Sequence, residues 1–228
     1  MRSTRSAALT TDEPNVVGPL NADWSAILLT GGAGTRMGRE KSGVVLGDFT
    51  LVDHVLSGLP TGVEVIVVGP DLPQPPRPVT CTRESPVGGG PVAGLAAGLD
   101  LVTTQITCVI ATDMPFAGGL LSHLAHRIPQ GADALVPVDA TGQRQPLCAA
   151  YRTTALRTAV EALGEVQDAS MRSLLDHLVV AEITLTDLAE LHDVGSLLDP
   201  NSLLDIDTPS DLDRSRAIML ETKGRAHE

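Results

Sequence analysis

Runs of consecutive apolar residues alternate along this chain with segments in which apolar residues recur at helical spacing. A strand buried on both faces is apolar throughout, whereas a helix that covers a sheet is apolar along one stripe. Apolar runs predict strands at residues 24–30, 63–68, 79–83, 106–111, 134–138, 145–151 and 179–185. Helical spacing predicts helices at residues 51–58, 120–128, 153–163 and 170–178, another after Pro91, and a closing helix that begins at Thr208-Pro209.

This alternation indicates an α/β fold with a mostly parallel sheet covered by helices on both faces. In such sheets, ligands bind outside the carboxyl ends of the strands. This rule places four segments at one edge of the sheet: residues 31–41, residues 88–94, Asp113 and residues 205–207. We expect a short strand before Thr208, on which Asp205 and Asp207 alternate, so that only one of them need face the site.

Residues 24–220 are predicted to form one domain, with a tail of residues 1–23 before it and a tail of residues 221–228 after it. The first tail is rich in Ser, Thr, Asp, Asn and Pro and shows no sustained periodicity, which is typical of disorder. No apolar run approaches the roughly 20 residues of a membrane span, and the N-terminus lacks the pattern of a signal peptide. We therefore expect a cytoplasmic protein without a membrane partner.

Composition excludes other classes of function. The formal net charge is -12 and the basic residues are scattered, so a nucleic acid is not an expected partner. Cys81, Cys108 and Cys148 are widely spaced and form no zinc-binding pattern, so they are expected to be reduced structural thiols. Aromatic residues make up only 2% of the chain, so recognition of a base must use the backbone and small side chains.

Residues 26–41 read AILLTGGAGTRMGREK, an apolar run followed by glycines and cations. Glycine allows φ > 0 and lets bare N–H groups approach a ligand, while Arg36 and Lys41 add fixed positive charge. A turn that merely connects a strand to a helix needs neither four glycines nor an aligned arginine and lysine. We therefore expect this loop to bind an anion, and phosphate is the expected one.

Spacing argues against two common phosphate-binding loops. A P-loop requires GxxxxGK[ST], but two residues separate Gly38 from Lys41. A dinucleotide-binding loop requires GxGxxG, whereas residues 32–38 give the looser GxGxxxG. Asp53 lies near the expected distance for a ribose-binding acid, but it falls inside a predicted helix. Hydride transfer with a dinucleotide is therefore a weak alternative.

Two further segments offer complementary groups. Three glycines at residues 88–90 lead into Pro91 and a helix whose first N–H groups are available to an anion. Asp113 follows the predicted strand 106–111, where a carboxylate can reach a ligand at the sheet edge. A structural alternative is that Asp113 caps the next turn. Likewise, Asp205 and Asp207 would favour the N-terminus of the closing helix through its dipole.

Five stretches resemble the molybdenum cofactor guanylyltransferase (MobA-like) family of nucleotidyltransferases. LLTGGAGTRMGREK, residues 28–41, resembles the signature LxGGxxxRMGxDK. GPVAGLAAGL, ATDMPF, QPLCAAY and DIDTPSDL are similar to the family's GPLAGLxxGL, TDMPF, EPLxAxY and NINTPEDL, and they come in the same order. The resemblance covers the chain from about residue 25 to residue 213.

The resemblance implies a Rossmann-like three-layer αβα domain of the nucleotide-diphospho-sugar transferase type. It also implies attack of a molybdopterin phosphate oxygen on the α-phosphorus of GTP, with release of pyrophosphate. Arg36 and Lys41 would neutralise the triphosphate, Asp113 would hold Mg²⁺, and Asp207 or Asp205 would be the second carboxylate. The implied nucleotide contacts are Leu29, Thr30, Gly31, Gly32, Gly34, Thr35, Lys41, Gly90, Pro91, Gly94 and Asp113.

The choice of base and acceptor depends on fewer residues. Related cytidylyltransferases tend to carry Ala-Ala-Gly where this chain has Thr30-Gly31-Gly32, and the missing methyl at Gly31 gives room for a purine. Glu40, Asp205 and Asp207 depart from the family's usual Asp and Asn, which leaves the substrates more open than the reaction. Candidates for contact with the acceptor are Gln143, Arg144, Gln145 and Arg172.

Three functions remain open. The leading one is a Mg²⁺-dependent guanylyltransferase that acts on molybdopterin. A second is nucleotidyl transfer with cytosine as the base or another small phosphate as the acceptor. The third is a nucleotide-binding partner in molybdoenzyme maturation without activity of its own. The expected partners are GTP and molybdopterin, with transient contacts to cofactor-biosynthesis proteins or apo-molybdoenzymes.

Overall fold

The structure is a computed structural model that describes residues 23–31, 43–191 and 198–225, with only the backbone for residues 221–225. The strands in these ranges are β1 (Trp24–Leu29), β2 (Val45–Leu46), β3 (Phe49–Thr50), β4 (Glu64–Val68), β5 (Thr80–Thr82), β6 (Ile106–Ala111), β7 (Ala134–Val138), β8 (Cys148–Arg152) and β9 (Val180–Thr184). The helices are α1 (Leu51–Gly58), α2 (Gly90–Leu99), α3 (Gly118–Ala125), α4 (Thr153–Leu163), α5 (Met171–Leu175), α6 (Leu185–Ala189) and α7 (Pro209–Arg225).

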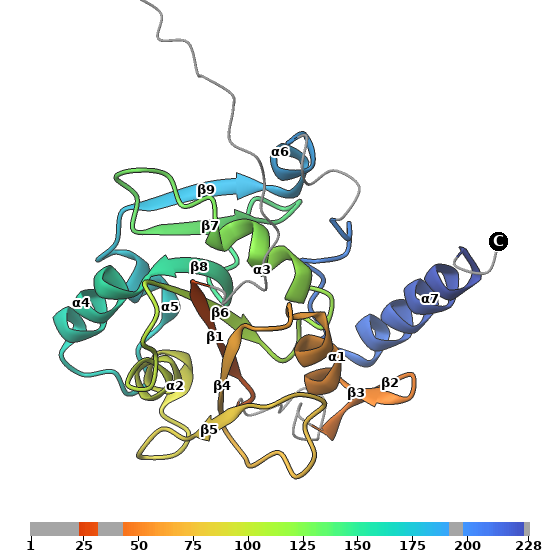
Figure 1. The fold of residues 1–228 in the computed structure, drawn as a ribbon, viewed down its shortest axis with the longest axis horizontal. Helices are drawn as coiled ribbons and strands as arrows, with labels where there is room; N and C mark the ends of the chain where they lie inside the picture. Colours follow the sequence, from red (N-terminus) through yellow and green to blue (C-terminus); the bar gives the residue numbers. More distant parts are fainter. Residues whose placement is uncertain (1–22, 32–42, 192–197, 226–228) are drawn as a thin grey trace, which may run out of the picture.

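Seven strands form one sheet in the order β5-β4-β1-β6-β8-β7-β9 (Figure 1). Strands β5, β4, β1 and β6 pair in parallel, as do β7 and β9, while β8 runs antiparallel to both of its neighbours. In the central register, Leu29 at the end of β1 lies opposite Val68 of β4 and Ala111 of β6. The predicted α/β fold with a mostly parallel sheet is therefore confirmed.

Helices cover both faces of the sheet, because successive side chains of β1 point alternately into two different cores, each lined by helices. Ala26 and Leu28 point into a core that includes side chains of α1 and α3, whereas Ile27 and Leu29 point into a core with side chains of α2, α4 and α5. A third, smaller cluster joins the β2–β3 hairpin to α7. Within the described residues, no helix is both long and apolar enough to cross a membrane.

The closing segment differs from its prediction. Residues 203–207 form no strand, so Asp205 and Asp207 do not alternate on one. Instead, the fully buried Ile206 packs with Val44, Leu46 and Leu51. The segment is thus anchored by an apolar side chain and by separate hydrogen bonds of its backbone, among them one from Ile206 N–H to the carbonyl of Asp113, and not by a strand ladder.

The ends of two other elements also differ. The helix predicted at residues 120–128 begins at Gly118 and ends at Ala125. The strand predicted at residues 145–151 begins only at Cys148, because Cys148 N–H donates to the carbonyl of Gln145 in a turn. In contrast, α1, α4, β6 and β7 have the predicted bounds.

Arg77, in the proline-rich connection between β4 and β5, closes the C-terminal end of α1. Its guanidinium donates to the carbonyl oxygens of Leu59 (2.9 Å), Pro60 (3.0 Å) and Val63 (2.8 Å). Burial lowers the pKa of Arg77 from its ordinary value. The connection between β4 and β5 thus supplies a charged donor to the carbonyl oxygens that follow the C-terminal end of α1.

Arg77→Ala should lower the free energy of unfolding by about 2 kcal/mol, because several carbonyls lose a charge-assisted donor that is partly exposed to solvent. Urea unfolding followed by circular dichroism measures the change. Arg216→Ala is the matched control, since Arg216 pairs with Asp213 at an exposed position, and should cost less than about 0.5 kcal/mol. Equal losses in the two variants would contradict the capping role of Arg77.

Candidate functional site

Two buried threonines fix the point where the chain leaves the centre of the sheet. Thr30, after β1, donates from its N–H and its Oγ1 to the carbonyl of Val68, at 2.9 and 3.0 Å. Thr112, after β6, donates from both groups to the carbonyl of Leu29, at 3.1 and 3.0 Å. Gly69 has φ 143°, and a Cβ there would lie 2.2 Å from Thr30 Oγ1. The carboxyl ends of β1, β4 and β6 are therefore locked together at this edge.

The glycine loop begins at this locked edge. Gly31 is exposed directly after Thr30. The remaining predicted loop residues lie outside the described residues, and their contacts stay predictions: Gly32, Gly34, Thr35, Arg36 and Lys41.

Asp113 and the segment around Ile206 meet at the same edge. The N–H of Ile206 donates to the carbonyl oxygen of Asp113 at 2.9 Å, which places Asp205 and Asp207 on either side of this contact. The pKa of Asp205 is raised above its ordinary value, because its surroundings desolvate the carboxylate and because Asp207 and Asp113 add negative charge nearby. Asp205 thus lies near the carboxylate of Asp207 and near that of Asp113, which comes from a different motif.

These carboxylates have the chemistry of a site for a hard cation. A divalent ion would relieve the repulsion that Asp207 and Asp113 exert on Asp205, and carboxylate oxygens are ligands that Mg²⁺ prefers. No set of three or more Asp, Glu, His or Cys side chains in the described part of the chain is arranged to hold a metal by itself. Since Mg²⁺ can bind one or two carboxylates and take its other ligands from phosphate and water, a role of Asp113, Asp205 and Asp207 in metal binding stays a prediction.

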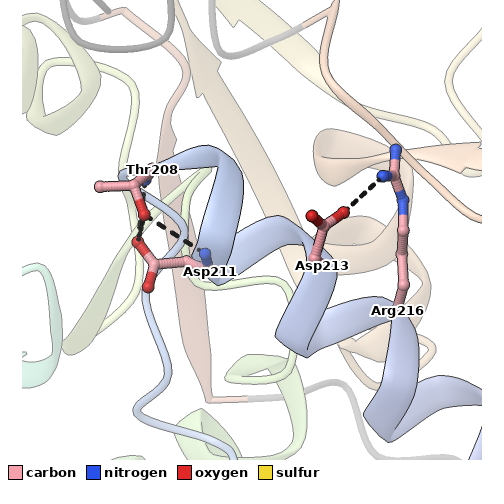
Figure 2. Close-up of polar contacts among 4 residues, drawn as sticks. All are labelled: Thr208, Asp211, Asp213 and Arg216. Atoms are coloured by element: carbon pink, nitrogen blue, oxygen red, sulfur yellow. Dashed lines mark hydrogen bonds and ion pairs between the residues drawn. The ribbon is translucent and has the colours of Figure 1, made fainter.

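The N-terminal cap of α7 tests the alternative that Asp205 and Asp207 serve to stabilise the start of this helix. Figure 2 shows that Thr208 and Asp211 make this cap: Asp211 N–H donates to Thr208 Oγ1 at 3.3 Å, and Asp211 Oδ2 accepts from Thr208 N–H at 2.8 Å. Hydrogen bonds from Thr208 lower the pKa of Asp211. The acidic side chain that caps α7 is therefore Asp211.

The second glycine loop leads into α2 close to β1. Gly88 and Gly90 have φ of 84° and 86°, Gly89 is the N-cap residue, and Pro91 lies in the first turn. Gly94 is buried one turn later, where a Cβ would lie 3.4 Å from Leu29 Cδ2. Gly94 and Leu29 therefore lie where α2 packs on β1, while Gly90 and Pro91 stand at the open end of the helix.

Glu84 is a candidate that the sequence reasoning missed. It follows β5, and its Oε1 accepts a hydrogen bond from Gly88 N–H at 3.0 Å. The same oxygen lies 4.0 Å from the position that a Cβ on Gly31 would take. Glu84 thus binds the second glycine loop and lies close to Gly31, at the start of the first. The sequence did contain a signal for Glu84, because an acidic residue directly after the predicted strand 79–83 is expected at the carboxyl edge of the sheet.

The candidates for acceptor contact lie in two places. Arg144 Nε donates to Glu182 Oε1 of β9 at 2.6 Å, and Gln145 Nε2 donates to Asp139 Oδ2 at 2.8 Å. Desolvation alone would raise the pKa of Asp139, but hydrogen bonds from Thr141, Gln143 and Gln145 outweigh it and lower the pKa. These residues therefore organise the turn between β7 and β8. Arg172 is exposed on α5, and an acceptor contact of any of them stays a prediction.

Comparison with known proteins agrees with this architecture. A curated relative, a probable molybdenum cofactor guanylyltransferase of Mycobacterium tuberculosis, is 31% identical over 75% of this chain and 88% of its own length. The crystal structure of molybdopterin-guanine dinucleotide biosynthesis protein A from Archaeoglobus fulgidus matches with a TM-score of 0.68 and 26% identity over 86% of this chain and 99% of that chain.

A more distant solved structure shows the breadth of the fold. The 2-C-methyl-D-erythritol 4-phosphate cytidylyltransferase from Thermus thermophilus matches with a TM-score of 0.60 and 20% identity, over 85% of this chain and 97% of that chain. The sequence model of the MobA-like NTP transferase domain matches residues 26–183, which include most of β1, the second glycine loop and Asp113. The chain therefore belongs to the MobA-like NTP transferase family.

Proposed function

We propose that this protein transfers GMP from GTP to molybdopterin, forming the guanine dinucleotide cofactor and pyrophosphate. The observation that carries the proposal is the hydrogen bond from Ile206 N–H to the Asp113 carbonyl, which brings the carboxylates of Asp113, Asp205 and Asp207 to the edge where the glycine loop begins. The names of the relatives at 31% and 26% identity support guanine and molybdopterin as the substrates.

The reaction forms one P–O bond and breaks another. An oxygen of the acceptor phosphate attacks the α-phosphorus of GTP, and the bond from that phosphorus to the β-phosphate oxygen breaks, so that pyrophosphate leaves. Because no covalent intermediate with the protein is required, the protein acts by positioning and by charge. In this proposal, Arg36 and Lys41 neutralise the triphosphate, and the first N–H groups of α2 face the nucleotide.

Mg²⁺ is the cofactor in this proposal. Asp113 and one of Asp205 and Asp207 would hold it, and the ion would supply positive charge against the triphosphate and the leaving pyrophosphate. These carboxylates would hold the ion near the carboxyl ends of β1 and β6, where Thr30 and Thr112 fix the backbone.

Glu84 gives a physical reason for choosing guanine. The Watson–Crick edge of guanine presents two neighbouring donors, N1–H and the N2 amino group, and a carboxylate accepts from both. The same edge of cytosine presents a single donor, the N4 amino group, beside acceptors at N3 and O2, so a carboxylate gains one hydrogen bond there and is repelled by the neighbouring N3. Since Glu84 Oε1 lies beside Gly31, we propose that it contacts the base.

Pyrophosphate release tests the proposal. The purified protein is incubated with Mg²⁺, molybdopterin and each nucleoside triphosphate in turn, and release with GTP alone is expected. Release with CTP alone would overturn the choice of base. Nucleotide binding without release on any acceptor would favour a binding partner in molybdoenzyme maturation. Transfer of the product to apo-molybdoenzymes and a cytoplasmic location stay predictions.

Glu84→Gln should lower kcat/KM for GTP by roughly 10- to 100-fold, because the amide replaces one acceptor with a donor that faces guanine N–H groups. Steady-state pyrophosphate release with GTP and with CTP measures the change in preference. Glu161→Gln, at an exposed position of α4, is the control and should leave both rates unchanged. An unchanged GTP preference in Glu84→Gln would remove Glu84 from base recognition.

A further inference from the structure

Asp168 is the only non-glycine residue with a positive φ in the part of the chain that the structure describes. Its φ of 56° lies in the left-handed region, which residues other than Gly, Asn and Asp rarely occupy. Asp168 lies between α4 and α5. The side chains of Val166 and Ala169, on either side of it, pack against the core that contains α2. The unusual backbone is therefore held from both sides.

This backbone contacts the entrance of α2. The N–H of Asp168 donates to the carbonyl oxygen of Gly89, the N-cap residue of α2, at 2.8 Å. A Cβ on Gly90, the first residue of α2, would lie 3.7 Å from Asp168 Cα, in ordinary van der Waals contact. A hydrogen bond and a van der Waals contact thus join the α4–α5 connection to the second glycine loop.

The loop needs such support because three successive glycines lose much backbone entropy when they become ordered. It is held at two points: Glu84 Oε1 accepts from Gly88 N–H, and Asp168 N–H donates to Gly89. A loop that is ordered before GTP arrives does not lose that entropy on binding, so the affinity for GTP is higher. The carboxylate of Asp168 is exposed, so the contact depends on its backbone.

We propose that Asp168 is a positioning residue, whose left-handed backbone orders the Gly88–Gly90 loop for binding of GTP. This inference rests on the proposed function, in which that loop faces the nucleotide. A valine at position 168 disfavours the left-handed conformation, whereas glycine and asparagine accept it. The loss of GTP binding among substitutions at position 168 should therefore depend on whether the new residue accepts a positive φ, and not on whether it keeps the negative charge.

Isothermal titration of GTP in the presence of Mg²⁺ tests this order. Asp168→Val should raise the Kd for GTP roughly tenfold, while Asp168→Gly and Asp168→Asn should stay within about twofold of the wild type. In the free protein, hydrogen exchange should be faster for amides 89–95 in the valine variant alone. In turnover, the valine variant should show a higher KM for GTP with kcat retained.

Asp176→Val is the matched control, because it removes the same charge nearby at a residue with an ordinary helical φ of -64°. It should change neither the Kd nor the exchange of amides 89–95. Weakening of GTP binding in Asp168→Asn or Asp168→Gly equal to that in Asp168→Val would overturn the backbone role. A valine variant with a lower Tm but an unchanged Kd for GTP would also overturn the backbone role. If the wild type binds GTP but releases no pyrophosphate, the proposed function fails, whereas the Kd and exchange series still decides this inference.

Discussion

Asp113→Asn should lower the rate of pyrophosphate release with GTP, Mg²⁺ and molybdopterin by roughly 10²- to 10³-fold. Asparagine keeps the shape of the side chain but removes the negative charge that is proposed to hold Mg²⁺. Because Ile206 N–H binds the backbone carbonyl of Asp113, the contact between β6 and the segment before α7 is kept in the variant. The loss should therefore appear in turnover and in the Mg²⁺ concentration needed for half-maximal rate.

Stability distinguishes this role from the alternative, in which Asp113 caps a turn. The Tm of Asp113→Asn should stay within a few degrees of the wild type, and GTP should still bind without Mg²⁺. Asp100→Asn, at the exposed C-terminal end of α2, is the control and should retain full activity. A variant of Asp113 that loses stability in parallel with activity would support the structural role instead.

Gly118→Ala should lower the free energy of unfolding by about 3 kcal/mol, at the upper end of the effect of overpacking. The first residue of α3 touches the last residue of α1: a Cβ on Gly118 would lie 2.6 Å from the carbonyl carbon of Gly58 and 2.9 Å from its Cα. The obstacle is backbone, so no side-chain rotation relieves it, and α1 and α3 must move apart. Urea unfolding measures the loss.

Gly119→Ala is the matched control on the next residue of the same helix. A Cβ on Gly119 meets no atom within 4 Å. Alanine is also the better helix former, so this variant should be as stable as the wild type or more stable by up to about 1 kcal/mol. Equal destabilisation by the two substitutions would show that helix propensity, and not the contact between α1 and α3, controls the effect.

Much of the fold could be predicted because local pattern and tertiary structure agree. The apolar runs of β1, β4, β6 and β7 are buried in the sheet, as their composition requires. The helix α1 begins with Thr50 as N-cap and Asp53 as its capping-box partner, which also explains why Asp53 is no ribose-binding acid at a strand end. Residues 203–207 were misassigned because Ile206 is held by packing, which gives no periodic signal.

The site was predictable only in part. The strand-end rule and the motifs pointed to Asp113, Asp205 and Asp207, and the structure brings their segments together. The same rule, applied to the predicted strand 79–83, points to Glu84, but its hydrogen bond to Gly88 appears only in the structure. Asp168 follows no strand, and its role depends on its hydrogen bond to Gly89. Asp168 and Gly89 are far apart in the sequence, and a single contact between distant residues leaves no repeat or spacing in it.

By itself, the sequence determined the class of fold, the two glycine loops, the acidic segments and the resemblance to a nucleotidyltransferase family, because composition and spacing carry these features directly. Only the tertiary structure decided the antiparallel direction of β8, the contact of Gly58 with Gly118, and the placement of Glu84 and Asp168 beside the second glycine loop. The physical reason is that an apolar run has no direction, and that close contacts between backbones depend on the packing of the whole sheet and its helices.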